Sequence, residues 1–185
     1  MTPYRFCPQC GGPLHAGEHG GRTRAGCIAH TCDFVHWDNP VPVVAAVVTF
    51  QDRVLLVRNV GWPENFFALV TGFLEAEESP AQAAEREVAE ETGLVAEATR
   101  LLGVYPFALR NQVIIAYHVP VTGDAVRLQA DEIADSRWIS RERVMPWDAA
   151  TGLALRDWLA SIGIHRETVP AAEYRRGGYN TDDGG

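Results

Sequence analysis

The sequence has no apolar segment long enough to cross a bilayer. A membrane-spanning helix needs about 18 or more consecutive apolar residues, and the apolar run Val41–Phe50 stops after ten. The N-terminus also lacks a charged stretch followed by an apolar core, which a secretory signal peptide would have. We therefore expect a cytoplasmic protein without a membrane partner.

Positive charge is also scarce. Lys and Arg total 16 against 24 Asp and Glu, which gives a formal net charge of −8. Proteins that bind nucleic-acid polymers rely on an excess of basic residues, so we expect no nucleic-acid polymer but a small anionic substrate, neutralised by a divalent cation. With 46% hydrophobic and 22% charged residues over 185 positions, the composition is typical of one globular domain with a small appendage.

Cysteine is absent after residue 32. The four cysteines are Cys7, Cys10, Cys27 and Cys32. In a chain without export signals, pairs at this separation favour zinc over disulfides, and four thiolates make a closed tetrahedral structural site. We predict a zinc ribbon over residues 1–37. Two alternatives stay open: His30, which lies inside the unusually long second pair, replaces one cysteine, or no metal binds.

Against these absences, residues 79–93 carry strong helix signals. Ser79 suits the N-cap, Pro80 suits the first turn, and Gln82 closes a capping box with Ser79. Gly93 suits a left-handed C-cap. We predict a helix from about Pro80 to Thr92. Its predicted apolar stripe consists of Ala81, Ala84 and Val88.

Three carboxylates share one face of this predicted helix. Glu87, Glu90 and Glu91 stand at positions i, i+3 and i+4, one turn apart. Like charges at this spacing repel by about 0.2–0.5 kcal/mol, so a bound cation would explain the arrangement. Oxygen ligands favour a hard cation such as Mg²⁺ or Mn²⁺. The alternative is a solvated acidic surface with Arg86 as its counter-ion.

The same glutamates belong to a 23-residue pattern, G-x5-E-x7-R-E-U-x-E-E-x-G-U, in which U is a bulky aliphatic residue. Its positions are filled by Gly72, Glu78, Arg86, Glu87, Val88, Glu90, Glu91, Gly93 and Leu94. The segment resembles a Nudix box.

That resemblance implies a hydrolase that uses Mg²⁺ or Mn²⁺ to split a nucleoside diphosphate linked to a group X. The implied products are a nucleoside monophosphate and phosphorylated X. The resemblance also implies that the Gly72 carbonyl joins the metal ligands. Arg86 is expected to point off the metal face and to orient the carboxylates through a bidentate pair with Glu78.

A zinc ribbon before a Nudix domain resembles the NADH pyrophosphatase branch of the family, as does the join from Phe34 to Pro40. That branch carries S-Q-P-W-P-F-P-x-S after the box, whereas residues 104–112 here read V-Y-P-F-A-L-R-N-Q. The resemblance thus implies NAD(H), ADP-ribose or another nucleotide derivative as substrate, and a homodimer. The candidate substrate-binding residues are Tyr105, Phe107 and Asn111, the first two as stacking partners for a ring.

Glu132 is the candidate carboxylate outside the box. It precedes the pair Arg137-Trp138, before which many Nudix proteins place a metal-binding glutamate on a loop. By resemblance, Glu132 is a further metal ligand or the general base, and Glu87 competes for the role of base. Two alternatives stay open: Glu132 is a solvated loop acid, or Asp131 takes its place.

The remaining pattern indicates a mixed α/β fold, similar to the Nudix α/β/α sandwich with a mixed sheet, over residues 38–163. An amphipathic pattern predicts a second helix at Asp148–Ile162. Short β-branched runs predict strands at Val43–Phe50, Arg53–Val57, Phe66–Val70, Leu101–Phe107, Val113–Val119 and Ser136–Ile139. Residues 164–185 turn polar, which predicts a mobile C-terminal tail.

Two rival functions compete with hydrolysis. A catalytically silent adaptor, which binds a nucleotide or a regulatory protein, would have lost box carboxylates, and this box keeps all of them. A non-hydrolytic enzyme of the same fold, such as an isopentenyl diphosphate isomerase, needs a cysteine in its core domain, and every cysteine here precedes residue 33. We therefore expect a pyrophosphohydrolase.

Overall fold

The chain divides between Pro40 and Val41 into two compact units. The computed structural model describes residues 4–177. We predicted the boundary at residues 37 and 38, in the segment that joins the last strand of the first unit to the first strand of the second. No helix within the described range is long and apolar enough to span a bilayer.

The first unit is a three-stranded antiparallel sheet in the order β1-β2-β3. Its strands are β1 (Leu14–His19), β2 (Arg22–Cys27) and β3 (Val35–His36). Gly20 and Gly21 make the hairpin turn between β1 and β2 with φ of 58° and 75°, a left-handed conformation that a side chain would strain. This hairpin separates the two cysteine pairs along the sequence and lets them meet in space.

The second unit is built on a mixed sheet in the order β7-β8-β4-β5-β9, with β6 paired to β4. Its strands are β4 (Val41–Phe50), β5 (Arg53–Asn59), β6 (Val70–Phe73), β7 (Arg100–Phe107), β8 (Gln112–Pro120) and β9 (Ile133–Ser140). β4 and β8 run parallel, and the other pairs run antiparallel.

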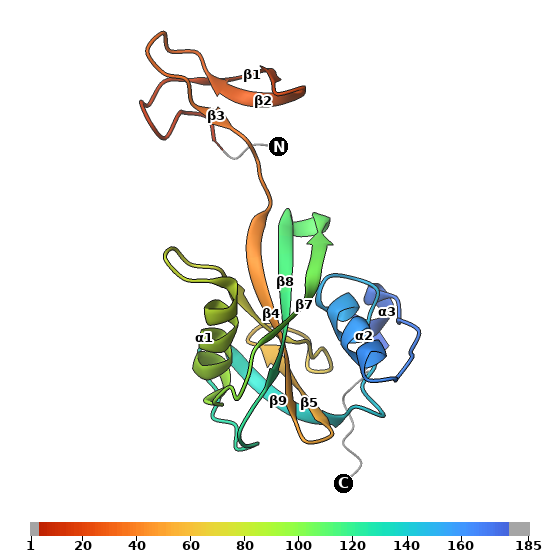
Figure 1. The fold of residues 1–185 in the computed structure, drawn as a ribbon. Coiled ribbons are helices and arrows are strands. Elements are labelled where there is room, and N and C mark those ends of the chain that lie inside the picture. The colour runs from red at the N-terminus through yellow and green to blue at the C-terminus, as the bar shows by residue number, and fades with distance from the viewer. Residues whose placement is uncertain (1–3, 178–185) are drawn as a thin grey trace. The chain divides into compact units, whose positions relative to one another are not determined.

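Helices cover both faces of this sheet (Figure 1), so the predicted α/β/α sandwich is confirmed. The helices are α1 (Pro80–Thr92), α2 (Thr151–Ser161) and α3 (Ala171–Gly177). α1 packs on one face, and α2 and α3 pack on the other. Successive side chains of β4 point to opposite faces of the sheet and pack into different cores. Val48 belongs to the core under α1, and Val47 belongs to the core under α2 and α3.

α1 begins and ends where the sequence predicts. The Ser79 hydroxyl accepts a hydrogen bond from the Gln82 amide at 3.3 Å, and the Gln82 side chain accepts one from the Ser79 amide at 2.9 Å. Gly93 ends the helix with φ of 68°, and its amide donates to the Ala89 carbonyl at 2.9 Å. The buried residues of α1 are Ala83, Ala84, Val88, Glu91 and Thr92. A glutamate is therefore part of the buried face.

The apolar segment predicted as the strand Phe66–Val70 is mostly a loop. Of its first four residues, only Ala68 forms a β-bridge, and its partner is Val57. Strand β6 begins only at Val70. Phe67 is fully buried in the core under α2 and α3. Short apolar runs indicate burial, and a loop packed under helices satisfies that pattern as well as a strand does.

The predicted mobile tail is wrong for residues 164–177. α3 occupies the end of this segment, and Tyr174 is fully buried. The Tyr174 hydroxyl donates to the Phe67 carbonyl at 2.8 Å, and its ring stacks on Trp147 with centroids 4.5 Å apart. Burying one large side chain contributes about 2 kcal/mol, which holds an otherwise polar segment against the body. The rest of the predicted tail, 178–185, lies outside the described residues.

Candidate active site

A cleft of about 940 Å³ lies between residues of α1, the end of β6 and the loop before β9. Its charged lining consists of Glu75, Arg86, Glu87, Glu90, Glu91, Arg127 and Glu132. We call it the carboxylate cleft. Glu91 is 3% exposed, whereas the side chains of Glu87 and Glu90 are 13% and 53% exposed. Of these three glutamates, the alternative of a solvated acidic surface therefore fits Glu90 alone; it also fits Glu85, which is exposed on α1.

Glu91 is the carboxylate that most needs a cation as partner. Its Oε2 atom is buried and has no hydrogen-bond partner among the described residues. Burial, together with the negative charges of Glu87, Glu132 and Glu90, raises the pKa of Glu91 to about 8. A buried carboxylate is tolerated when it is paired, protonated or coordinated to a metal. The carboxylates of Glu87, Glu90, Glu91 and Glu132 in one cleft make a donor set that fits a hard divalent cation.

Glu87 lies against the backbone of β6. A Cβ atom built on Gly72 would lie 1.8 Å from Cδ of Glu87, so only glycine leaves room for this carboxylate. Burial raises the pKa of Glu87, and the hydrogen bond from Arg86 opposes that shift only in part. Glu87 and the Gly72 backbone therefore meet in one corner of the cleft, as a shared metal site requires.

Arg86 holds the carboxylates together and does not point off their face as predicted. Its guanidinium makes a bidentate pair with Glu78 at 2.9 and 3.1 Å. The same group donates to Glu87 at 2.8 Å, to Glu90 at 3.0 Å and to the Phe73 carbonyl at 3.1 Å. An arginine side chain is long enough to reach one helical turn along, which is why it meets Glu90 at i+4. Its hydrogen bond lowers the pKa of Glu78.

Glu132 joins the cleft from the loop before β9. Two hydrogen bonds fix its backbone: the Val60 amide donates to its carbonyl at 2.7 Å, and its amide donates to the Gln129 carbonyl at 3.1 Å. After burial and Glu87, its charge contributes to the raised pKa of Glu91. Asp131 does not line the cleft. Position therefore favours Glu132 over Asp131.

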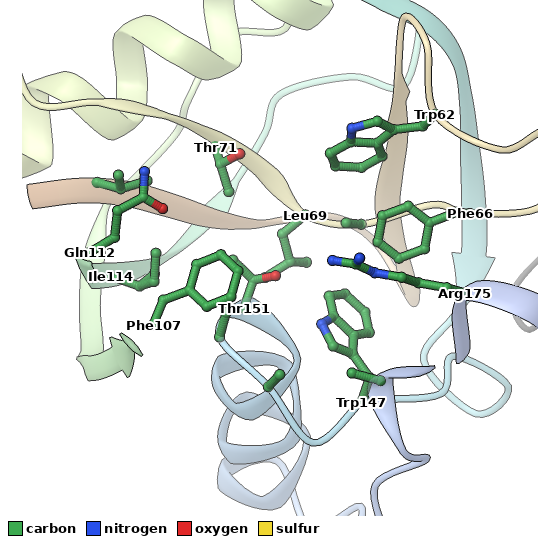
Figure 2. A pocket seen from close by; sticks show the side chains of 15 residues that line it. Trp62, Phe66, Leu69, Thr71, Phe107, Gln112, Ile114, Trp147, Thr151 and Arg175 are labelled. Carbon is green, nitrogen blue, oxygen red and sulfur yellow. The ribbon is translucent and has the colours of Figure 1, made fainter. Parts of the chain in front are cut away.

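A second hollow, of about 160 Å³, adjoins the carboxylate cleft because Val43, Thr71 and Gln112 line both. We call it the aromatic hollow. Its further lining includes four aromatic and two polar side chains: Trp62, Phe66, Phe107, Trp147, Thr151 and Arg175 (Figure 2). The polar pair comes from α2 and α3, so the helices on the second face of the sheet complete this hollow.

Of the three predicted substrate-binding residues, Phe107 lines the aromatic hollow and the other two do not. Tyr105 is buried, and its hydroxyl donates to Asp157 on α2 at 2.9 Å, so it belongs to the core. Asn111 ends the 3₁₀ helix η1 (Ala108–Arg110) in a left-handed conformation with φ of 50°. Sequence reasoning missed the other residues of the hollow, which share no local spacing; among them are Trp62, Phe66, Trp147, Thr151 and Arg175.

The four cysteines of the first unit form a cluster with metal-binding geometry. Their sulfur atoms all lie within 4.8 Å of one another, with Cys7 3.7 Å from Cys32 and Cys10 3.5 Å from Cys27. Bonds of about 2.3 Å to one tetrahedral Zn²⁺ place sulfurs about 3.8 Å apart, whereas a disulfide needs about 2 Å. His30 is not part of the cluster, which removes it as an alternative ligand.

The thiols of this cluster differ in how readily they ionise. Burial raises the pKa of the Cys7 thiol, but hydrogen bonds from the Cys10 and Gln9 amides outweigh it and lower that pKa to about 7. The Phe34 amide lowers the pKa of Cys32, but burial and the neighbouring thiols raise it to about 12. A divalent cation at the centre would stabilise all four thiolates together, so the donor set fits zinc.

Known proteins share this fold and this box. Residues 39–159 match the NUDIX domain, and the chain therefore belongs to the Nudix family. It is 28% identical over 152 residues to the NAD-capped RNA hydrolase NudC of Vibrio vulnificus, which covers 82% of this chain and 56% of that protein. It is 31% identical over 150 residues to a NAD-capped RNA hydrolase of Macaca fascicularis, which covers 77% of this chain and 32% of that protein.

These relatives confirm the resemblance to the NADH pyrophosphatase branch. The chain spans about half the length of the bacterial relatives it matches. Among solved structures, a NUDIX hydrolase from Nitrosomonas europaea has a TM-score of 0.71 at 23% identity, and the match covers 90% of this chain and 97% of that one. At this identity the likeness shows the fold alone.

Proposed function

We propose that this protein hydrolyses the phosphoanhydride bond of a nucleoside diphosphate linked to a second group X. The products are a nucleoside monophosphate and phosphorylated X. The buried Glu91 carboxylate carries this proposal, because its Oε2 atom has no hydrogen-bond partner in the described chain and lies in one cleft with Glu87, Glu90 and Glu132. Packing of α1 gives no reason to gather carboxylates in one cleft, whereas oxygen ligands of this kind suit a divalent cation that also binds a diphosphate.

Mg²⁺ or Mn²⁺ would be held by the carboxylates of Glu87, Glu90 and Glu91 with the Gly72 carbonyl. When bound, such a cation would neutralise the diphosphate and would lower the pKa of a water molecule that attacks it. The chain supports these ligands by its own hydrogen bonds, because Glu78 holds Arg86 and Arg86 holds Glu87 and Glu90. The ligands are therefore oriented before a substrate arrives.

We assign the general base to Glu132 rather than to Glu87. The Glu87 carboxylate accepts a hydrogen bond from Arg86 at 2.8 Å and lies against Gly72, which suits a fixed ligand. In the described part of the chain, no hydrogen bond or ion pair reaches the Glu132 carboxylate, which lines the cleft. It is therefore free to accept a proton from the attacking water. Glu132→Gln should lower kcat and leave cation affinity unchanged, whereas Glu87→Gln should weaken both.

The proposed substrates are NAD(H), ADP-ribose and related nucleotide derivatives, either free or attached to RNA. The relatives of V. vulnificus and M. fascicularis are named NAD-capped RNA hydrolases, which conflicts with our expectation that no nucleic-acid polymer is a partner. The net charge of −8 does not exclude such a substrate, because cleaving a cap requires recognition of a terminal nucleotide rather than a long backbone. The aromatic hollow beside the cleft supports a substrate with a ring next to its diphosphate.

A substrate panel tests the proposed function. The panel contains NADH, NAD⁺, ADP-ribose, diadenosine polyphosphates and nucleoside triphosphates, each with Mg²⁺ and with Mn²⁺, and chromatography measures the products. We expect release of a nucleoside monophosphate that requires the cation. Binding of these nucleotides without cleavage of any would identify the protein as the silent adaptor instead.

We propose a structural role for the first unit. A zinc ion on Cys7, Cys10, Cys27 and Cys32 would have no open coordination position, so it would stabilise the fold and take no part in hydrolysis. The homodimer stays a prediction, which sedimentation equilibrium would measure.

A further inference from the structure

The two faces of the three-stranded sheet in the first unit carry different side chains. Residues that pair directly across two strands lie on the same face, and every second residue of a strand shares that face. The register of β1, β2 and β3 therefore gathers one set of residues, which we call the basic face: His15, Gly17, His19, Arg22, Arg24, Gly26 and Val35. Glu18, the only carboxylate in these three strands, lies on the opposite face.

The basic face differs in charge from the rest of the protein. It holds two arginines and two histidines and no acidic residue. Residues 1–40 contain three Arg and three Asp or Glu, so the net charge of −8 comes entirely from residues 41–185. The net charge of the second unit repels a polyanion, whereas that of the first unit does not. The total charge of the chain conceals this difference.

Glycines leave room for two rings at this face. A Cβ atom built on Gly26 would lie 2.4 Å from Nε2 of His19, and one built on Gly17 would lie 3.2 Å from the same atom. The imidazole therefore rests directly on the backbone of two strands, and a larger residue at position 26 would displace it. In the same way, a Cβ atom built on Gly20 would lie 3.3 Å from Cζ3 of Trp37. Both rings therefore lie close against the sheet.

Trp37 follows β3 and is held beside the basic face by Arg24. Cζ of Arg24 lies 4.9 Å from the centroid of the indole ring, and its Nε donates to the Trp37 carbonyl at 3.3 Å. Nη1 of Arg24 also donates to the His19 carbonyl. Trp37 is nevertheless 50% exposed. An aromatic ring that is held in place while half of its surface is free loses little conformational freedom when a ligand stacks on it.

We propose that the basic face and Trp37 bind single-stranded RNA, as the strand that carries a nucleotide cap. The indole and the imidazole of His19 offer stacking surfaces to unpaired bases, and the two arginines pair with phosphates of the backbone. Arg22 is exposed, and its side chain has no hydrogen bond or ion pair within the described residues, so it is free to meet a phosphate. The presence of a cap rests on the proposed function, whereas binding of the strand does not.

The chemistry of this face distinguishes a single strand from other anions. In duplex RNA the bases are paired and stacked on one another, so their ring faces are closed to Trp37. An acidic protein segment would pair with the arginines but has no base to stack on the exposed indole. A free nucleotide such as ADP-ribose has no strand, so its hydrolysis does not involve this face.

Fluorescence anisotropy with an uncapped oligoribonucleotide of about ten nucleotides, a length within the site sizes of single-strand-binding proteins, tests the proposal. The zinc-loaded full-length protein is titrated without Mg²⁺ or Mn²⁺, so no hydrolysis takes place. Trp37→Ala should weaken binding about tenfold, which corresponds to the loss of one stacked base. Arg22→Gln should lower the slope of log affinity against log salt concentration by about 0.7, the share of one phosphate contact. A duplex of the same sequence should bind about tenfold more weakly than the single strand.

Arg5→Gln is the matched control, because it removes the same charge from the first unit. The Leu14 amide donates to the Arg5 carbonyl at 3.1 Å, and Leu14 belongs to the face opposite the basic face. This variant should keep the affinity and the salt slope of wild type. Zinc content and unfolding curves equal to those of wild type would show that each variant folds, and Arg22→Gln removes no contact of the sheet.

Any of four results would overturn the inference: no binding of the strand by wild type at low salt, wild-type affinity in Trp37→Ala, equal salt slopes in Arg22→Gln and Arg5→Gln, or equal affinity for duplex and single strand. The oligonucleotide has no cap, so the outcome does not depend on hydrolysis. A protein that binds the strand but cleaves no nucleotide would refute the proposed function alone. One that cleaves ADP-ribose but binds no strand would refute this inference alone.

Discussion

The carboxylate cleft and the aromatic hollow share three residues but are built in different ways. The cleft takes most of its charged groups from residues 75–91, and Arg127 and Glu132 come from one later loop. The hollow is lined by residues of four strands (β4, β6, β7 and β8), of the loop before β6, of the start of α2 and the loop before it, and of α3. Local spacing along one helix therefore specifies the chemistry of the cleft, whereas long-range packing specifies the shape of the hollow beside it. Substitutions in the carboxylate cleft and in the aromatic hollow should therefore have different effects.

The largest expected effect comes from breaking the cleft alone with Glu91→Gln. The amide keeps the shape of the side chain but not the charge that a cation needs. We expect kcat to fall by about 1000-fold, which corresponds to the several kcal/mol that a catalytic metal supplies. Stability should be retained, because a carboxyl with a pKa of about 8 is mostly protonated at neutral pH, and the neutral amide has the same shape. The control is Glu85→Gln on the exposed side of α1, and steady-state kinetics with Mg²⁺ measure both. A wild-type kcat in Glu91→Gln would contradict the ligand role.

Gly72→Ala should act on the same cleft through geometry rather than charge. The added Cβ would lie 1.8 Å from Cδ of Glu87, so this carboxylate must move. Displacing a group that orients a metal site lowers activity by about 10- to 100-fold, and the same assay measures it. Gly123→Ala is the matched control, because its Cβ would meet nothing within 4 Å. Equal activity of the two variants would argue against a fixed position for Glu87.

Trp62→Ala should break the hollow and spare the cleft. Loss of one stacking surface for the base should raise KM by about tenfold, within the range of 1–3 kcal/mol per stacked base. The value of kcat should stay near that of wild type, since the carboxylates are untouched. Trp37→Ala, in the first unit, is the control. A fall in kcat at unchanged KM would mean that the hollow does not bind substrate.

Removal of zinc from the first unit should leave the carboxylate cleft and the aromatic hollow functional. A chelator, followed by dialysis into Mg²⁺ or Mn²⁺, should lower the unfolding temperature of the first unit, because metal binding to such a site contributes folding free energy. The ratio of the rates with Mg²⁺ and Mn²⁺ should not change. Calorimetry and the substrate assay measure the two effects. An unaltered melting curve would count against the zinc ribbon.

The smallest expected effect is a loss of folding stability in acid, which arises from His118 on the side of the sheet that faces α2. The ring of His118 lies 5.5 Å from that of Trp158, and its Nε2 lies 2.9 Å from the Thr49 hydroxyl. Burial, with the positive charge of Arg100, lowers the pKa of His118 from 6.5 to about 4. Between these values the unfolded chain binds a proton that the folded chain rejects. This contribution to stability is therefore complete above pH 6.5 and is lost as the pH falls toward 4.

Urea unfolding of wild type and His118→Gln across this pH range measures the effect. The variant should lose less stability on acidification. Equal losses of stability in the two proteins would show that His118 takes up a proton as readily in the folded protein as in the unfolded chain.

The contrast between cleft and hollow also explains how much could be predicted from the sequence. The bounds of α1 follow from Ser79, Gln82 and Gly93, and the shared face of its glutamates follows from helical spacing, so all of these were predictable. The cysteine cluster was predictable from the spacing of its members. The residues that decide these two features lie within one helix or in two closely spaced pairs of cysteines.

The rest depended on tertiary packing. Trp62 and Arg175 line one hollow only because α3 packs back onto the sheet. The buried Tyr174 holds α3 in place, but its neighbours in the sequence are exposed, so no sequence pattern indicates its burial. Tyr105 could not be separated from Phe107 by sequence, because its partner Asp157 is brought near by α2. Helical spacing places the Cα of Arg86 on a face, but its long side chain is not confined to that face.

Manganese binding tests the central claim most directly. Calorimetric titration of Mn²⁺ into the zinc-loaded protein should show binding in wild type and its loss in Glu87→Gln and Glu91→Gln. The control Glu85→Gln should bind as wild type does. Equal Mn²⁺ binding in all four proteins would mean that the glutamates of α1 are not cation ligands, and the account of hydrolysis in the carboxylate cleft would be wrong.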